Sequence, residues 1–172
     1  MNHTAITEYL NFRQQIDQTV TRLEKIYQPH LHCAKGCDQC CFSFRVFPVE
    51  WFAIAGQLNK HFETINKDQP IGELEKCLFL KNHACTIYPH RPIICRTHGL
   101  PLLSMNETGT EWELNICELN FTEADDDSFD DDNLIEQDTL NSELFQINKR
   151  FIADNPQLNL SEFDLIPLKA LV

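Results

Sequence analysis

The sequence predicts an α+β fold that is mostly helical: a single compact domain, residues 1–172, with a small antiparallel β-hairpin region and cysteine-rich metal-binding loops. Apolar residues recur at helical spacing near both ends of the chain, and short apolar or alternating runs lie between these segments. Eight cysteines are concentrated within residues 33–117. With 172 residues and 42% hydrophobic content, the chain is long enough for one ordinary domain.

The N-terminal part predicts two helices separated by the first cysteines. Apolar side chains at helical spacing predict a helix over about residues 5–27, and Pro29 ends it. Apolar and polar residues alternate over residues 42–46, as in a short strand. Pro48 suits the first turn of a second helix, which we expect to run to about Lys67.

The middle of the chain predicts short strands and a helical turn. The runs CLFL and CTIY, separated by KNHA, suit a hairpin within residues 77–88. A helical turn over residues 93–96 follows two prolines, and residues 100–105 and 111–116 are expected to pair across a turn. A third long helix is expected from about Leu134 until the chain reaches Pro156.

Residues 122–133 carry seven acidic side chains and almost no apolar ones, which predicts an acidic solvated loop. The spacing of these carboxylates lacks the order of an EF-hand, and no glycine occupies the turning position. Calcium binding is therefore disfavoured.

Charge and hydropathy exclude several kinds of partner. The net charge of this acidic protein is −12, which repels nucleic-acid phosphates and anionic lipid surfaces. No stretch approaches the roughly 18 consecutive apolar residues of a membrane span. The N-terminal segment lacks the features of a secretory signal, so we expect a cytoplasmic protein with reduced thiols. Metal binding is accordingly favoured over a disulfide framework.

The cysteines form one tight C-x3-C-x2-C-C cluster followed by a wider series, a pattern typical of metal centres because neighbouring thiolates repel one another unless a cation neutralises them. All eight are candidate metal ligands: Cys33, Cys37, Cys40, Cys41, Cys77, Cys85, Cys95 and Cys117.

Within this series, Cys37 and Cys40 form the strongest pair, since a C-x2-C step can turn both sulfurs toward one ion. Cys40 and Cys41 are adjacent, and in an extended chain their side chains would point to opposite faces and not easily reach one small ion. The cofactor is therefore expected to be an iron–sulfur cluster or zinc, held in one centre or in two.

A thiolate centre adds negative charge to an acidic chain, so nearby cations would compensate it. Arg91 and Arg96 lie closest in sequence to Cys95 and are candidates to do so by donating hydrogen bonds around the cofactor, although Arg91 could equally be solvent-exposed and Arg96 could bind a carboxylate. Histidines could replace a sulfur but are more often surface or core residues; the candidates are His32, His83, His90 and His98.

No phosphate-binding loop, dinucleotide fingerprint, H-E-x-x-H helix or nucleophile elbow is present, so the sequence carries no standard catalytic signature. Three functions remain open. The chain could be an iron–sulfur protein, a zinc-stabilised interaction module with a protein partner or its metal-delivery variant, or an enzyme that uses a metal or thiolate site.

Two segments carry a family resemblance. CAKGCDQCCFSFRVFPVEW, followed by CLFLKNHACTIYPHRPIICRTHGLP, resembles the YkgJ-type cysteine cluster family of zinc- or iron-chelating domains over about residues 33–117. The resemblance implies metal chelation by a core set of ligands and by a trailing Cys117, whereas Cys33 departs from the family spacing by one extra residue. The implied core set is Cys37, Cys40, Cys41, Cys77, Cys85 and Cys95.

Overall fold

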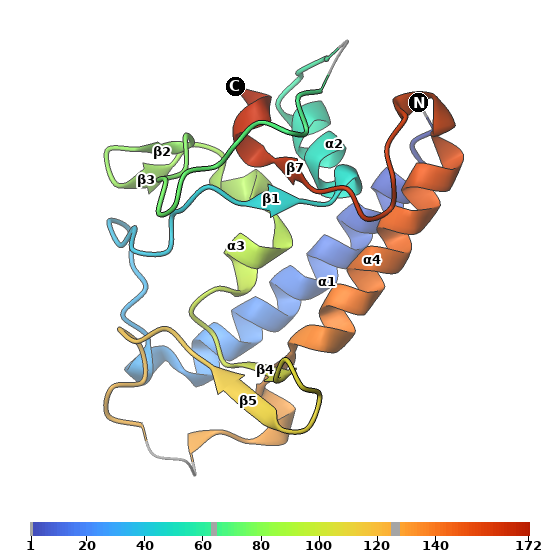
Figure 1. The fold of residues 1–172 in the computed structure, drawn as a ribbon. Coiled ribbons are helices and arrows are strands. Elements are labelled where there is room, and N and C mark those ends of the chain that lie inside the picture. Colours follow the sequence, from blue (N-terminus) through green and yellow to red (C-terminus); the bar gives the residue numbers. More distant parts are fainter. Residues whose placement is uncertain (1, 63–64, 125–127) are drawn as a thin grey trace. The chain divides into compact units, whose positions relative to one another are not determined.

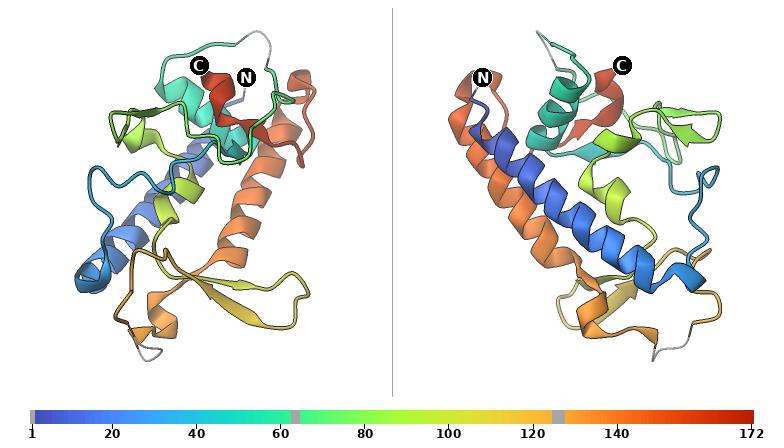
Figure 2. Two further views of the ribbon diagram at one scale, coloured as in Figure 1. Left: turned by 60° about the vertical axis from the view of Figure 1, so that its left-hand side comes forward. Right: turned by 180° about the vertical axis from the view of Figure 1, so that it is seen from behind.

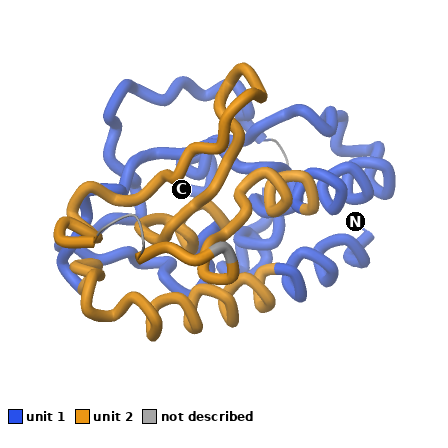
Figure 3. Tube along the Cα trace, turned by 90° about the horizontal axis from the view of Figure 1, so that it is seen from below, with its two compact units in different colours: residues 1–12, 35–92, 144–172 blue, residues 13–34, 93–143 orange. Residues whose placement is uncertain are grey.

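The computed structural model describes residues 2–62, 65–124 and 128–172 (Figure 1). It has the predicted α+β, mostly helical class, with long helices at the two ends of the sequence and short strands between them. The contacts divide the chain into two units, coloured separately in Figure 3. Unit 1 comprises residues 1–12, 35–92 and 144–172, and unit 2 comprises residues 13–34 and 93–143. The prediction of a single domain over residues 1–172 stays a prediction.

The two long helices agree with their predicted ranges. Helix α1 spans Thr4–Ile26 and helix α4 spans Gln137–Asp154. Within unit 1, the first turns of α1 and the last turns of α4 lie side by side (Figure 2). Glu8 and Arg150 form an ion pair between them, and the Asn2 amide donates to the side chain of Asn155 (2.8 Å).

Helix α2, Pro48–Gln57, begins at the predicted proline but ends well before Lys67. A C-terminal cap explains the difference: Asn59 adopts a left-handed conformation (φ 53°), and the Lys60 and Asn59 amides donate to the carbonyls of Ala55 and Gly56. This is the Schellman arrangement that stops a helix. The predicted continuation includes residues 63–64, which lie outside the described residues.

The core of unit 1 is built from side chains on α1, α2, α4 and the C-terminal segment. Trp51, Ile54, Phe151 and Ile166 are 0% exposed and come from two parts of the sequence that lie about a hundred residues apart. Burying such apolar side chains is the main stabilising contribution available to the unit. This core therefore holds the first strand of the unit, and the loops beside it, in place.

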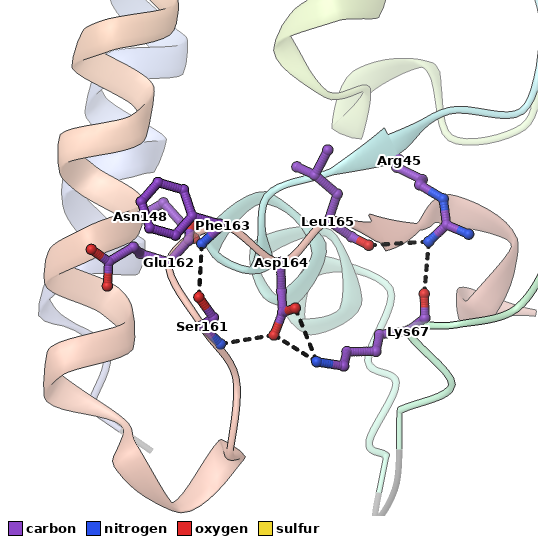
Figure 4. A network of polar contacts seen from close by, with 8 residues as sticks. All are labelled: Arg45, Lys67, Asn148, Ser161, Glu162, Phe163, Asp164 and Leu165. Carbon is purple, nitrogen blue, oxygen red and sulfur yellow. Dashed lines mark hydrogen bonds and ion pairs between the residues drawn. The ribbon is translucent and has the colours of Figure 1, made fainter.

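Strands β1 (Arg45–Val46) and β7 (Ile166–Pro167) pair antiparallel, which fixes the C-terminal segment on unit 1. Figure 4 shows the polar contacts around this segment. The carboxylate of Asp164 accepts hydrogen bonds from the Lys67 ammonium (2.8 and 2.9 Å) and the Ser161 amide (2.7 Å). The Arg45 guanidinium donates to the carbonyl oxygen of Lys67 (2.7 Å) and to that of Leu165 (3.2 Å).

The predicted hairpin within residues 77–88 is present as β2 (Leu80–Lys81) and β3 (Ala84–Cys85), which pair antiparallel. Asn82 and His83 connect the strands with positive φ angles of 50° and 58°. Two successive left-handed residues form the type I′ turn whose twist matches that of paired strands. The short strands place Cys85 opposite Leu80.

Unit 2 contains a sheet with the strand order β5-β4-β6. The predicted pairing is found between β4 (Leu102–Met105) and β5 (Trp112–Asn115), whereas β6 (Ile135–Glu136) adds a parallel neighbour that the sequence did not indicate. The predicted helical turn is α3, Ile93–Thr97. Leu23, Tyr27, Ile93 and Phe121 are at most 4% exposed and form part of the core of this unit.

The acidic segment 122–133 is described only in part, because residues 125–127 lie outside the described residues. Its end forms a single 3-10 turn, Asp131–Asn133, in which the Asp130 side chain accepts a hydrogen bond from the Asp132 amide. Its solvated character stays a prediction. In the described part of the chain, no helix is long and apolar enough to cross a membrane.

Candidate metal centre

The loop that carries the adjacent cysteines is not extended. The Cys41 amide donates to the Asp38 carbonyl (3.0 Å), and the Phe42 amide donates to the Cys40 carbonyl (2.9 Å), so two tight turns follow each other. The Cys40 side chain acts to lower the pKa of Cys41, which burial raises, so the two thiols interact. The expectation that these side chains point to opposite faces applied to an extended backbone, which this loop does not have.

The segment of Cys77 lies directly beside this loop. The Cys77 amide donates to the Cys41 carbonyl (3.0 Å), and a bridge between Phe42 and Lys76 continues the contact. The Leu80 amide donates to the Cys77 carbonyl (3.0 Å), and the backbone amides of Phe79 and Leu80 act to lower the pKa of the Cys77 thiol, which burial raises. Backbone amides aimed at a sulfur favour its thiolate form, as is common for metal-bound cysteines.

Cys85 completes a group of three thiols drawn from three separate stretches of sequence. As thiolates, Cys41, Cys77 and Cys85 repel one another in every pairing. Burial raises the pKa of Cys41, and the charges of Cys85 and Cys77 raise it further. Burial also raises the pKa of Cys77, and Cys85 adds to this, while the backbone amides act in the opposite direction. A bound cation would relieve this repulsion.

Charged and polar residues surround the group. Asp38 adds negative charge that also raises the pKa of Cys41. The Lys76 ammonium donates to the Asp38 carbonyl oxygen (3.0 Å) and lies 4.5 Å from the centre of the Phe42 ring. His83 contacts the Asp38 carboxylate through Nδ1 (2.7 Å). Lys76 thus places a cation next to the loop of Cys40 and Cys41, a position that sequence proximity to Cys95 did not suggest.

Unit 2 holds a second, smaller grouping around Cys33 and Cys117. A Cβ added at Gly99 would lie 3.0 Å from the Cys33 sulfur and 4.0 Å from Cys117 Cβ. Asn120, 2% exposed, donates to the Cys33 sulfur (3.3 Å) and to the Gly99 carbonyl (2.8 Å), and it accepts from the His32 amide (2.8 Å). Cys33 is thus held by a buried amide despite its extra spacer residue.

The predicted cofactor-binding arginines make other contacts. The Arg96 side chain is buried and donates to the Asp17 carboxylate, and the Arg91 guanidinium lies 3.6 Å from the centre of the Tyr88 ring. Both were predicted as neutralising residues, and that role stays a prediction. Cys95, the remaining thiol of unit 2, lies half-buried in α3.

The other candidates lie apart from these contacts. Cys37 is exposed in the loop before Asp38. His90 Nδ1 contacts the Gln57 side chain (2.7 Å). His98 is an exposed residue. The protein around its ring nevertheless desolvates it in part, and this lowers its pKa.

None of the eight cysteines forms a disulfide. Among the described residues, no group of three or more His, Cys, Asp or Glu side chains already has the geometry of a metal site. Unit 1 contributes Cys37, Cys40, Cys41, Cys77 and Cys85, and unit 2 contributes Cys33, Cys95 and Cys117.

Asn120 and Lys76 are residues that sequence reasoning missed. Nothing in the spacing marks Asn120, since its partners at His32 and Gly99 lie in distant segments. Lys76 directly precedes Cys77, and this position next to a candidate ligand could have identified it from the sequence.

The fold and these thiols define a small α+β protein with a sulfur-rich donor set. The chain belongs to the CxxCxxCC family, described as "Putative zinc- or iron-chelating domain", whose model matches residues 32–118. That range contains every cysteine of the sequence. Neither the comparison with curated proteins nor the comparison with solved structures gives a match.

Proposed function

We propose that the protein binds one metal centre in unit 1, a zinc ion or an iron–sulfur cluster, through the thiolates of Cys40, Cys41, Cys77 and Cys85. The observation that carries this proposal is the backbone contact of three separate stretches of sequence: the Cys77 amide donates to the Cys41 carbonyl (3.0 Å), the Leu80 amide donates to the Cys77 carbonyl (3.0 Å), and Leu80 pairs with Cys85. The charges of Cys41, Cys77 and Cys85 also oppose one another. Thiols that oppose one another's ionisation in a half-buried position are stabilised as thiolates by a bound cation.

The donor chemistry fits both metals. A set made only of sulfur suits zinc and iron–sulfur clusters, while calcium and magnesium require oxygen ligands. The turns at Cys40 and Cys41 support a single centre, because the backbone there is not extended and the two thiols interact. Bound zinc would supply a structural or exchangeable ion, whereas a bound cluster would supply one-electron transfer.

Residues of the chain support the thiolates in two ways. The backbone amides of Phe79 and Leu80 act to lower the pKa of Cys77 and would favour its thiolate with a metal bound. Lys76 supplies a positive charge next to the loop. Cys37 is a further candidate ligand from the same loop, and Cys33, Cys95 and Cys117 are candidates for a second centre in unit 2.

The test is anaerobic purification with zinc, iron and acid-labile sulfide measured on the same sample. Zinc alone in a colourless protein identifies an ion, and iron with sulfide in a brown protein that bleaches on reduction identifies a cluster. A protein without either metal after this precaution contradicts the proposal.

Serine substitutions then locate the centre. Cys41→Ser, Cys77→Ser and Cys85→Ser should each lower the metal content and the unfolding midpoint together, because ligation contributes to folding. Cys33→Ser in unit 2 is the matched control and should keep the metal of unit 1. Full metal content in the Cys41, Cys77 and Cys85 variants would exclude this centre, whereas loss in the Cys33 variant as well would show that unit 2 also takes part.

A further inference from the structure

The outer strand of the sheet in unit 2 offers an open edge. In the order β5-β4-β6, strand β5 is hydrogen-bonded to β4 on one side and, among the described residues, has no strand on the other. Its four residues, Trp112–Asn115, all have exposed side chains. An edge strand with unpaired backbone groups is a ready template for another strand.

The register of the hairpin shows which backbone groups are available. The Asn106 amide donates to the Glu111 carbonyl (2.9 Å), which makes these two residues a hydrogen-bonded pair. Hydrogen-bonded and non-hydrogen-bonded pairs alternate along an antiparallel ladder. The backbone N–H and C=O groups of the odd-numbered residues of β5 therefore point to β4. The N–H and C=O groups of Trp112 and Leu114 therefore point to the open edge.

The two faces of β5 differ in chemistry. Trp112 and Leu114 share one face and are 58% and 39% exposed, although large apolar side chains usually avoid water. Glu113 and Asn115 occupy the opposite face, because successive side chains of a strand alternate. One side of an incoming strand would thus meet apolar groups, and its other side would meet a carboxylate.

The charge around β5 indicates that a partner should be positively charged. Residues 97–148 contain no Lys or Arg, while Glu107, Glu111, Glu113 and Glu118 lie on the hairpin or just after it. An acidic surface of this kind attracts cationic segments and repels anionic ones.

We propose that strand β5 binds an extended peptide segment in which apolar residues alternate with Lys or Arg, added as a further strand along its open edge. The backbone of Trp112 and Leu114 would pair with the segment, its apolar side chains would cover those two residues, and its cations would face Glu113. A second copy of the chain is disfavoured as the occupant, because it would bring the acidic side chains of two β5 strands together. This inference does not depend on the metal centre.

The probe is a blocked octapeptide of alternating Lys and Val, titrated into the purified, metal-containing protein. The chain has two tryptophans, and Trp51 is 0% exposed, so quenching of fluorescence by acrylamide reports mainly on Trp112. Binding should shift the emission to shorter wavelength and lower the quenching. The same peptide with N-methyl groups on alternate backbone nitrogens keeps its charge and side chains but cannot pair, and it should not bind.

Two charge-reversal variants distinguish binding at strand β5 from a general attraction of the cationic peptide to the acidic surface. Glu113→Lys should weaken binding of the octapeptide about tenfold or more, since it opposes a cation directly across the new pair. Glu107→Lys makes the same charge change in the exposed turn and should have a much smaller effect. Circular dichroism of both variants checks that the fold is kept.

Three results would overturn the proposal. Equal binding of the N-methylated peptide would show that no backbone pairing occurs. Equal weakening by Glu107→Lys and Glu113→Lys would reduce the effect to non-specific charge attraction. Dimerisation of the protein alone that is changed by Glu113→Lys but not by Glu107→Lys would make a second copy the occupant of the edge.

Discussion

At the scale of single residues, one buried amide shows what sequence spacing leaves out. Asn120 connects the Cys33 sulfur, the Gly99 carbonyl and the His32 amide, and it is almost completely buried. The sequence identified Cys33 as a candidate ligand, since cysteine chemistry is visible in composition. It could not identify Asn120, because an asparagine acquires its role only from distant groups that the fold brings to it.

Gly99 leads to a prediction at this scale. Gly99→Ala should destabilise the protein, because φ is 95° and the new Cβ would lie 3.0 Å from the Cys33 sulfur. Backbone strain alone costs about 1–3 kcal/mol. Gly36→Ala is a matched control, since φ is 106° there but nothing lies within 4 Å of the new Cβ. Urea unfolding of both variants should give the larger loss at Gly99, and equal losses would show that the contact with sulfur is unimportant.

At the scale of elements, sequence patterns were sufficient to predict the helices and hairpins that form between residues close together in the chain. Apolar periodicity predicted α1, and the two runs around Asn82 and His83 predicted the β2–β3 hairpin. The early end of α2 was not predicted, because it depends on the left-handed conformation of Asn59, which an asparagine adopts only occasionally. The β1–β7 pair joins residues more than a hundred positions apart, and no local pattern specifies such a partner.

The segment that carries β7 should make stability depend on pH. The Lys67 ammonium and the Ser161 amide lower the pKa of Asp164 below its ordinary value of 3.8. A carboxylate with a lowered folded-state pKa stabilises the fold above its unfolded-state pKa, and this contribution is lost as pH falls through the folded-state value. The free energy of unfolding should therefore decrease as the pH falls below about 4.

Asp164→Asn should make this acid dependence shallower, as measured by urea unfolding at a series of pH values between neutral and strongly acidic. Glu107→Gln, in the exposed turn of the β4–β5 hairpin, removes a carboxylate without touching this segment and serves as the control. An unchanged slope in the Asp164 variant would mean that its contact with Lys67 contributes nothing in solution.

At the scale of the whole molecule, the cysteines are divided between the two units. No sequence pattern indicates this division, because the units interleave along the chain and the cysteine-containing range, residues 33–117, is continuous. The family match covers that whole range, so it supports metal chelation without assigning ligands. Assigning ligands needs their geometry, and we base the proposed centre in unit 1 on the backbone contacts and the electrostatic interaction of Cys41, Cys77 and Cys85.

Removal of the metal should therefore loosen the two units unequally. After treatment with a strong chelator, backbone amides of residues 37–46 and 76–88 should exchange hydrogen faster, since ligation by Cys41, Cys77 and Cys85 would no longer connect these segments. Amides of β4 and β5 should change little. Mass spectrometry of peptides from both units measures this, and equal loosening of residues 102–116 would contradict a centre confined to unit 1.

The buried guanidinium of Arg96 has a consequence for proteolysis. A protease that cleaves after Lys or Arg meets only two candidate bonds between Lys81 and Lys149: Arg91 precedes Pro92, which blocks cleavage, and Arg96 is 7% exposed and bonded to Asp17. Digestion of the folded protein by such an enzyme leaves residues 82–149 as one piece. Mapping the accessible backbone of that region thus calls for a protease that cleaves after acidic residues, of which the region has many.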